Sequence, residues 1–349
     1  MRQPVVRGPF VRRGVRLCQG GEMLNWVDVV GYQYEFVHTG VLRALLDDDR
    51  YGVAIAQELT GSAAIAEVVS VAAQGHAGGR PGTRADLVAV LHMTDGSQQM
   101  LAVETKTDSA ASRRQMEGTA GEDHFACLLA VGLTSLQLSD LRPGAWGSET
   151  WTVSDLSDWA RVLRACGPLD PPLDAYVERV ERELRDHDDA RAAALVADTG
   201  ASDRSRTGQA LSDWAWMSAI SEAVAEAGAG SFWCLKLISG PVMYWHDSAA
   251  SIPGGGHLYL DFMIENGVRR LVLKGGDVPV NMRKAVWDAG VAGVGREATR
   301  SRGRPAAGRT GSFKIAAIDL IDMPIEKIVE TAVRFRGRLP VIAASVAHG

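Results

Sequence analysis

Three charged side chains stand near the ends of two otherwise apolar stretches, RADLVAVLH (84–92) and QQMLAVETK (98–106). Asp86 belongs to the first stretch, and Glu104 and Lys106 belong to the second. Unpaired charge is costly to bury, so charges at these positions need one another or a ligand. Two carboxylates facing each other across a strand pair, about 5 Å apart, favour a cation between them, and Mg²⁺ prefers oxygen ligands. Such an ion, with a lysine beside it, is suited to phosphodiester hydrolysis.

The two apolar stretches must hold these charges together. Both are apolar on their two alternating faces, which is typical of strands in the middle of a sheet that is covered on both sides. Glu104 and Lys106 are two residues apart and therefore share a face. Whether Asp86 joins them depends on the turn between the strands.

Two loop lengths are compatible with the turn sequence TDG (94–96). A two-residue loop, Asp95-Gly96, would set Asp86 opposite Thr105 and turn Glu104 to the other face. A three-residue loop that begins at Thr94 would set Asp86 opposite Glu104. A glycine stands where the longer loop needs a left-handed residue, so we predict the three-residue loop.

The elements around the hairpin follow from hydrophobic periodicity. The spacing predicts a helix over about 33–47, with an apolar face that includes Phe36, Val37, Val41 and Leu45, and with Glu35 and His38 in its first turns. A short helix ending at Gly61 and a strand at 66–74 come before the hairpin, and a helix at 108–118 and a buried strand at 124–133 come after it. The resulting order is helix, strand, strand, strand, helix, strand.

The positions of the polar residues on these elements carry a resemblance to a known family. Glu35, Asp86, Glu104-Thr105-Lys106 and Gln115 lie in an order that resembles the PD-(D/E)XK nuclease superfamily. More narrowly, YEFVHTGVLRALLDD (34–48) is similar to the E-x-x-H-[ST]-x-x-L-x-x-LL opening of one bacterial and phage branch, where an R-x-D strand, an E-x-K strand and a Gln follow. The resemblance covers about residues 30–135, with weaker similarity after 150, and leaves 207–349 unexplained.

The resemblance implies a fold, an activity and a set of residue roles. The implied fold is α/β, a restriction-endonuclease-like αβββαβ core, with a mixed central sheet flanked by helices, a helical extension and a C-terminal α/β region. The implied activity is Mg²⁺-dependent hydrolysis of DNA phosphodiester bonds by a metal-activated water, with Mn²⁺ as a substitute ion and with defence or DNA processing as the setting. The implied catalytic residues are Glu35, Asp86, Glu104, Lys106 and Gln115. The implied metal ligands are Asp86, Glu104, the Thr105 carbonyl and Glu35.

Other interpretations of the same residues stay open. The charges at the hairpin end could form a structural ion-pair network, so the chain could instead be a nuclease-fold protein that binds nucleic acid without cutting it, or a protein-interaction module. Gln115 also has capping-box spacing from Ser112. His38 and Arg84 are candidates for supporting the metal ligands or touching substrate, although a helix histidine is more often a packed or surface residue.

A second candidate site is basic. GREATRSRGRPAAGRTGSFK (295–314) combines cationic residues with Gly, Ser, Thr and Pro, which suits contacts to phosphates. The candidate DNA-binding residues are Arg296, Arg300, Arg302, Arg304, Arg309 and Lys314. The alternative is a solvated loop. Five tryptophans could stack on bases, but their spacing favours core positions: Trp214, Trp216, Trp233, Trp245 and Trp287.

Composition limits the classes of partner and the cellular location that are compatible with this chain. The formal net charge of −5 gives no overall basic field, so contact with DNA must come from local patches, and RNA stays open as a substrate. Four scattered cysteines without a C-x-x-C pair favour reduced thiols in a cytoplasm, and no apolar run reaches the length of a bilayer span. Cutting both strands of a duplex would favour a homodimer.

The chain divides into four predicted segments. Residues 1–22 form a basic, disordered N-terminal arm, and 23–140 form the nuclease core. Residues 141–206 form the helical extension and linker, with the linker at 197–208, and 207–349 form the C-terminal α/β region.

Overall fold

The computed structural model describes most of the chain in ten ranges. These are 25–75, 84–107, 113–120, 124–139, 141, 151–195, 211–237, 240–265, 268–300 and 311–346. The predicted N-terminal arm (1–22) and the predicted linker (197–208) lie outside the described residues. Within those ranges, no helix is both long and apolar enough to cross a bilayer.

The first half of the chain is built on a mixed sheet of five strands. In spatial order these are β1 (Ile65–Ala73), β2 (Leu87–Met93), β3 (Gln98–Lys106), β4 (His124–Ala130) and β5 (Thr152–Ser154). The pairs β1–β2 and β2–β3 are antiparallel, and β3–β4 and β4–β5 are parallel. The expected α/β class with a mixed central sheet flanked by helices is confirmed.

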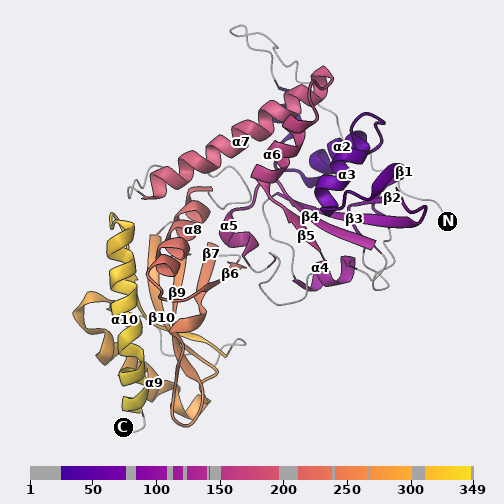
Figure 1. Ribbon diagram of the computed structural model, residues 1–349. Helices are drawn as coiled ribbons and strands as arrows, with labels where there is room; N and C mark the ends of the chain where they lie inside the picture. The colour runs from indigo at the N-terminus through magenta and orange to yellow at the C-terminus, as the bar shows by residue number, and fades with distance from the viewer. Residues whose placement is uncertain are drawn as a thin grey trace, which may run out of the picture.

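Helices cover both faces of this sheet (Figure 1). Leu87, Val103 and Leu129 face a core shared with the helices α1 (Trp26–Val30), α2 (Glu35–Leu46), α3 (Gly52–Thr60), α6 (Leu156–Ala165) and α7 (Pro171–Leu195). Leu128 and Ala130 face the other way and pack with the helices α4 (Arg113–Thr119) and α5 (Ser135–Leu138). Both faces of the central strands are therefore buried, as their continuous apolar sequence predicts.

The hairpin between β2 and β3 has the three-residue loop. Leu87 lies opposite Val103, and His92 lies opposite Gln98. Met93 N donates to Ser97 O at 2.9 Å, so only Thr94, Asp95 and Gly96 remain in the loop. Gly96 has φ +85°, the left-handed conformation that the longer loop needs. The prediction is confirmed, and the register, continued by one residue, sets Asp86 opposite Glu104.

This turn gives a stability prediction with a matched control. Gly96→Ala should destabilise the protein by about 1 to 2 kcal/mol because its φ is positive, although a Cβ would meet nothing within 4 Å. Gly40→Ala should instead stabilise by up to about 1 kcal/mol, because Gly40 lies inside α2 and its Cβ would also meet open space. Urea unfolding of both variants measures the difference. Equal stability of Gly96→Ala and the wild type would contradict the left-handed loop.

The helix predicted over 33–47 is confirmed as α2, but one member of its apolar face is wrong. Val37, Val41 and Leu45 are buried, whereas Phe36 is 65% exposed. The helical period explains the difference, because the buried residues of α2, which run from Val37 to Leu46, share one side of the helix and Phe36 falls on the opposite side. Phe36 instead projects beside Glu35 at the start of the helix.

The second half of the chain forms a separate antiparallel sheet. Its main strands are β6 (Phe232–Leu237), β7 (Gly240–Trp245), β9 (His257–Glu265), β10 (Val268–Gly276), β12 (Phe313–Asp319) and β11 (Thr299–Arg300), while β8 (Ala250–Ser251) pairs with β9. One sheet face packs with the helices α8 (Leu211–Glu226), α9 (Arg283–Val294) and α10 (Ile325–Ser345). Trp214, Trp216 and Trp245 are buried there, as predicted.

The long helix α7 joins the two halves. It packs on α1 and α6 at one end and on α8 at the other, and Figure 1 shows it running across the top of both. The predicted helical extension at 141–206 therefore contains α6 and α7, which contribute directly to the core of the first sheet.

Candidate active site

Four elements bring the predicted catalytic side chains together at one end of the first sheet. Glu35 is the first residue of α2, Asp86 directly precedes β2, Glu104 and Lys106 end β3, and Gln115 lies on α4. Hydrogen bonds and ion pairs connect Glu35, Lys106, Glu104 and Gln115, although 80 positions of sequence separate the first from the last. Asp86 is tied to this group through the backbone of Thr105.

Lys106 is the centre of this cluster. Its Nζ lies 2.7 Å from Glu104 Oε1 and 3.2 Å from Glu35 Oε2, and it donates to its neighbour Thr105 O at 3.0 Å. The side chain is only 11% exposed, so these contacts form largely out of water. Burial alone would lower the pKa of Lys106, but the hydrogen bond to Glu104 and the surrounding carboxylate charges outweigh it and raise the pKa. Lys106 is therefore a cation at neutral pH.

Glu104 is the most buried of the three carboxylates. Its side chain is 3% exposed, and its Oε1 accepts hydrogen bonds from Lys106 Nζ and from the Gln115 side-chain amide. Burial raises the pKa of Glu104, and the charges of Asp86 and Glu35 add to the rise against the lowering effect of Lys106. The contact with Gln115 favours the site interpretation of that residue. The capping partner considered for it, Ser112, lies outside the described residues.

Asp86 faces the same cluster from the neighbouring strand. Its Oδ2 accepts a hydrogen bond from Thr105 N at 2.9 Å, which ties the start of β2 to the end of β3. Its charge acts on both Glu104 and Lys106. The loop register thus produces the electrostatic contact that the sequence predicts.

The oxygen atoms around Lys106 suit a hard cation. The ammonium already binds both carboxylate oxygens of Glu35, one of Glu104 and the Thr105 carbonyl, so it stands in for the kind of ion these oxygens accept. Within the described ranges, however, no three His, Cys, Asp or Glu side chains are placed to hold a metal ion together. The donor types fit Mg²⁺, and binding would require the carboxylates to turn from their present hydrogen-bond partners.

His38 belongs to the core beside the cluster. It is fully buried, its Nε2 donates to Tyr32 O at 2.6 Å, and its Nδ1 lies 2.8 Å from Tyr176 Oη. A carbonyl oxygen can only accept, so Nε2 carries the proton and, in the neutral ring, Nδ1 accepts from the tyrosine hydroxyl. His38 thereby links α2 to α7.

This link gives a second stability prediction. Tyr176→Phe should lower the free energy of unfolding by about 1 to 3 kcal/mol, because it removes the hydrogen bonds of the Tyr176 hydroxyl with His38 and Trp159 in the core. Urea unfolding measures the loss. Equal stability of the variant and the wild type would contradict the buried link between α2 and α7.

The remaining predicted site residues lie apart from the cluster or outside the described residues. Arg84 is exposed two positions before Asp86. In the second half of the chain, Arg296 is exposed, Arg300 is the last residue of β11, and Lys314 Nζ lies 2.6 Å from Glu265 Oε2. Arg302, Arg304 and Arg309 fall outside the described residues. The basic DNA-binding patch therefore stays a prediction, with one of its members held in an ion pair.

Sequence reasoning missed two threonines that position the cluster. Thr39 Oγ1 donates to Thr105 Oγ1 at 3.3 Å and joins α2 to β3. Thr107 is buried, and its Oγ1 donates to Gln33 O at 2.8 Å. The helical spacing of Glu35 and Thr39 signals a shared face, but nothing in the sequence signals the contact of Thr107 with residue 33.

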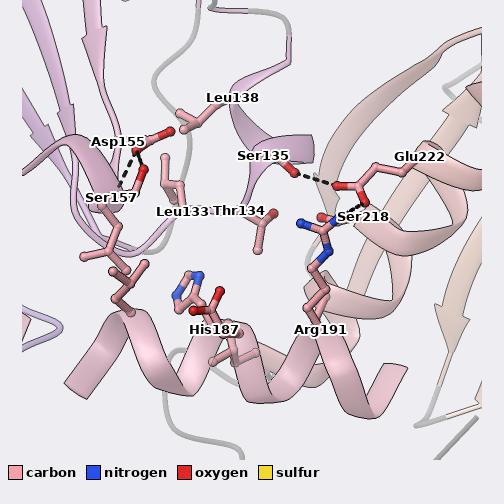
Figure 2. A pocket seen from close by; sticks show the side chains of 15 residues that line it. Leu133, Thr134, Ser135, Leu138, Asp155, Ser157, His187, Arg191, Ser218 and Glu222 are labelled. Carbon is pink, nitrogen blue, oxygen red and sulfur yellow. Dashed lines mark hydrogen bonds and ion pairs between the residues drawn. The ribbon is translucent and has the colours of Figure 1, made fainter. Parts of the chain in front are cut away.

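A hollow of about 200 Å³ lies elsewhere, between the two halves of the chain. Figure 2 shows His187 and Arg191 projecting into it from α7, with Arg191 paired to Glu222 of α8 at 2.6 Å. Ser135 of α5 also donates to Glu222, at 3.4 Å. None of the predicted catalytic residues lines this hollow, so it is distinct from the candidate active site.

No protein-family model, curated protein or solved structure matches this chain significantly. A function must therefore be derived from the chain's own residues.

Proposed function

We propose that this protein is a Mg²⁺-dependent nuclease that hydrolyses phosphodiester bonds of DNA. The observation that supports this most is the hairpin register, which sets Asp86 opposite Glu104 and brings both beside Lys106. Glu35 and Gln115 reach the same point from two helices. These are the residues expected from the resemblance to the PD-(D/E)XK superfamily.

The arrangement of elements supports the same proposal. Three helices, α1, α2 and α3, precede the strands β1, β2 and β3, and α4 connects β3 to the parallel strand β4. With these three helices counted as one helical segment, the order is compatible with the αβββαβ order expected for a restriction-endonuclease-like core. The carboxylates lie at the end of the sheet, where β3 stops and the chain passes to α4.

Each residue has a distinct role in the proposed reaction. The candidate ligands for the ion are Asp86, Glu104, the Thr105 carbonyl and Glu35. A bound Mg²⁺ supplies a more acidic water and positive charge beside the phosphate. Gln115 orients the Glu104 carboxylate through its amide.

Lys106 acts as a cation in this proposal. It is suited to holding the attacking water or the phosphate oxygens, because its ammonium lies among oxygen atoms of Glu35, Glu104 and Thr105.

One observation favours a structural role for the pair between Lys106 and Glu104 instead. Lys274 and Asp261, on adjacent strands of the second sheet, form a pair of 2.6 Å with side-chain exposures of 15% and 3%. The pair between Lys106 and Glu104 is almost identical in length and burial. A nuclease-fold protein that does not cut, with an ion-pair network at its hairpin end, is therefore the second candidate.

A substrate survey tests the proposal. The purified chain is incubated with supercoiled plasmid, linear duplex DNA, single-stranded DNA and RNA, with Mg²⁺, with Mn²⁺ and with EDTA. The expected result is cleavage of DNA with either Mg²⁺ or Mn²⁺, and no cleavage with EDTA. Absence of cleavage of every substrate would favour the structural candidate.

A further inference from the structure

Two aromatic side chains on the surface flank the candidate active site. Tyr34 is 48% exposed and Phe36 is 65% exposed, and they stand on either side of Glu35 in the chain. In the part of the chain that the structure describes, they are the only aromatic members of the exposed large hydrophobic side chains. Large aromatic side chains usually stabilise a fold by being buried in its core. The exposure of two of them beside Glu35 therefore suggests a binding role.

The two rings form one stacked pair. Their centroids lie 5.5 Å apart and their planes differ by 18°. The Tyr34 ring lies over Gly31, where an added Cβ would come within 2.7 Å of it, and Gly31 has φ +110°. The glycine therefore makes room for the ring, and a larger residue would displace it.

The aromatic pair is fixed relative to the end of β3. Thr107 Oγ1 donates to Gln33 O at 2.8 Å, next to Tyr34 in the chain. Lys106 contacts Glu35, next to Phe36, at 3.2 Å. Tyr34 and Phe36 are therefore direct chain neighbours of Gln33 and Glu35, two residues that are held to the end of β3.

The exposed side of α2 continues with features that suit a nucleotide. Gly40 and Arg43 follow Phe36 by four and seven positions, which places them on the same helix face. Gly40 leaves open space at the surface, and Arg43 is exposed and forms no ion pair with any described residue. An aromatic ring, an open backbone and a cation in succession match the base, sugar and phosphate of a strand.

We propose that Tyr34 and Phe36 form a stacking platform for an unpaired base next to the phosphate at the candidate active site. This inference rests on the proposed nuclease function and narrows its substrate to nucleic acid with unpaired bases. In a duplex, neighbouring bases already cover both faces of each base. A single strand, a frayed end or a flap leaves a face free to stack on the protein.

The test measures binding apart from cleavage. The full chain is titrated in EDTA with a single-stranded oligonucleotide that contains 2-aminopurine, whose fluorescence falls when the base stacks. The wild type should quench it and should bind this strand more tightly than the matching duplex. Tyr34→Ala combined with Phe36→Ala should remove the quenching and weaken binding about 10-fold to 100-fold.

Two matched variants separate stacking from general apolar contact. Tyr34→Leu combined with Phe36→Leu keeps apolar surface but has no ring faces, so it should also lose the quenching. Val280→Ala removes an equally exposed side chain, 69% exposed in the second half of the chain, and should bind like the wild type. Equal quenching by the wild type and the double leucine variant would overturn the platform.

The outcomes also distinguish this inference from the proposed function. Cleavage by the wild type that neither double variant changes would overturn the platform and leave the nuclease intact. Stacking without cleavage of any substrate would support the platform and reject the nuclease. If sedimentation shows a wild-type dimer that the alanine variant dissociates, with unchanged DNA binding, the pair is a contact between two copies and the platform is wrong.

Discussion

Replacing Lys106 by alanine is expected to lower the rate of DNA cleavage about 100-fold to 10,000-fold, the range usual for loss of a group that assists in the transition state. The reason is its position: Nζ contacts Glu35 and Glu104 and is held protonated by them. Single-turnover cleavage of a labelled oligonucleotide measures the rate.

The chain contains a close control for this variant. Lys274→Ala removes an equally buried lysine from an equally short pair with Asp261. Both variants leave a buried carboxylate without its cation, at a cost of up to about 3 to 5 kcal/mol in the free energy of unfolding. Only Lys106→Ala should lose cleavage when both are assayed below their unfolding temperatures. Equal loss in the two variants would mean that stability, rather than chemistry, explains the effect.

Asp86→Asn is expected to abolish the stabilisation of the protein by Mg²⁺. An ion that binds only the folded state, at 100 times its dissociation constant, adds about 2.7 kcal/mol to the free energy of unfolding. The wild type should therefore melt several degrees higher in Mg²⁺ than in EDTA. Asparagine can still accept the hydrogen bond from Thr105 N, so the variant should fold and yet lose a charged ligand.

Glu117→Gln provides the control for metal binding. Glu117 lies on α4, two residues from Gln115, but its carboxylate pairs with Arg113 at 2.8 Å on the surface. Its variant should keep the full Mg²⁺-dependent rise in melting temperature. The same rise in Asp86→Asn would show that Mg²⁺ binds elsewhere or that its effect is a general one of salt.

The sequence predicts those parts of the fold that depend on neighbouring residues. The continuous apolar runs predict the central strands, and Gly96 in TDG predicts the loop length. Because the side-chain period of a strand is two, this one loop decides whether Asp86 and Glu104 share a face. The clustering of the candidate site is therefore accessible from sequence alone.

Contacts between distant elements are less accessible. His38 lies 138 residues from Tyr176, and nothing in the helical pattern around His38 indicates a tyrosine partner on α7. Phe36 is apolar, yet it lies on the side of α2 opposite the buried residues and is left in solvent. The pattern fixes which residues are apolar, but the packing of α2 against β3 decides which of them are covered.

The most direct measurement is the position of a divalent ion in crystals of the wild-type protein grown with Mn²⁺, located by its anomalous scattering. If Mg²⁺ binds as proposed, one strong peak is expected at about 2.0 to 2.5 Å from a carboxylate oxygen of Asp86 and from one of Glu104. Crystals saturated with Mn²⁺ in which Lys106 still bridges Glu35 and Glu104, with no ion between the two strands, would contradict this proposal.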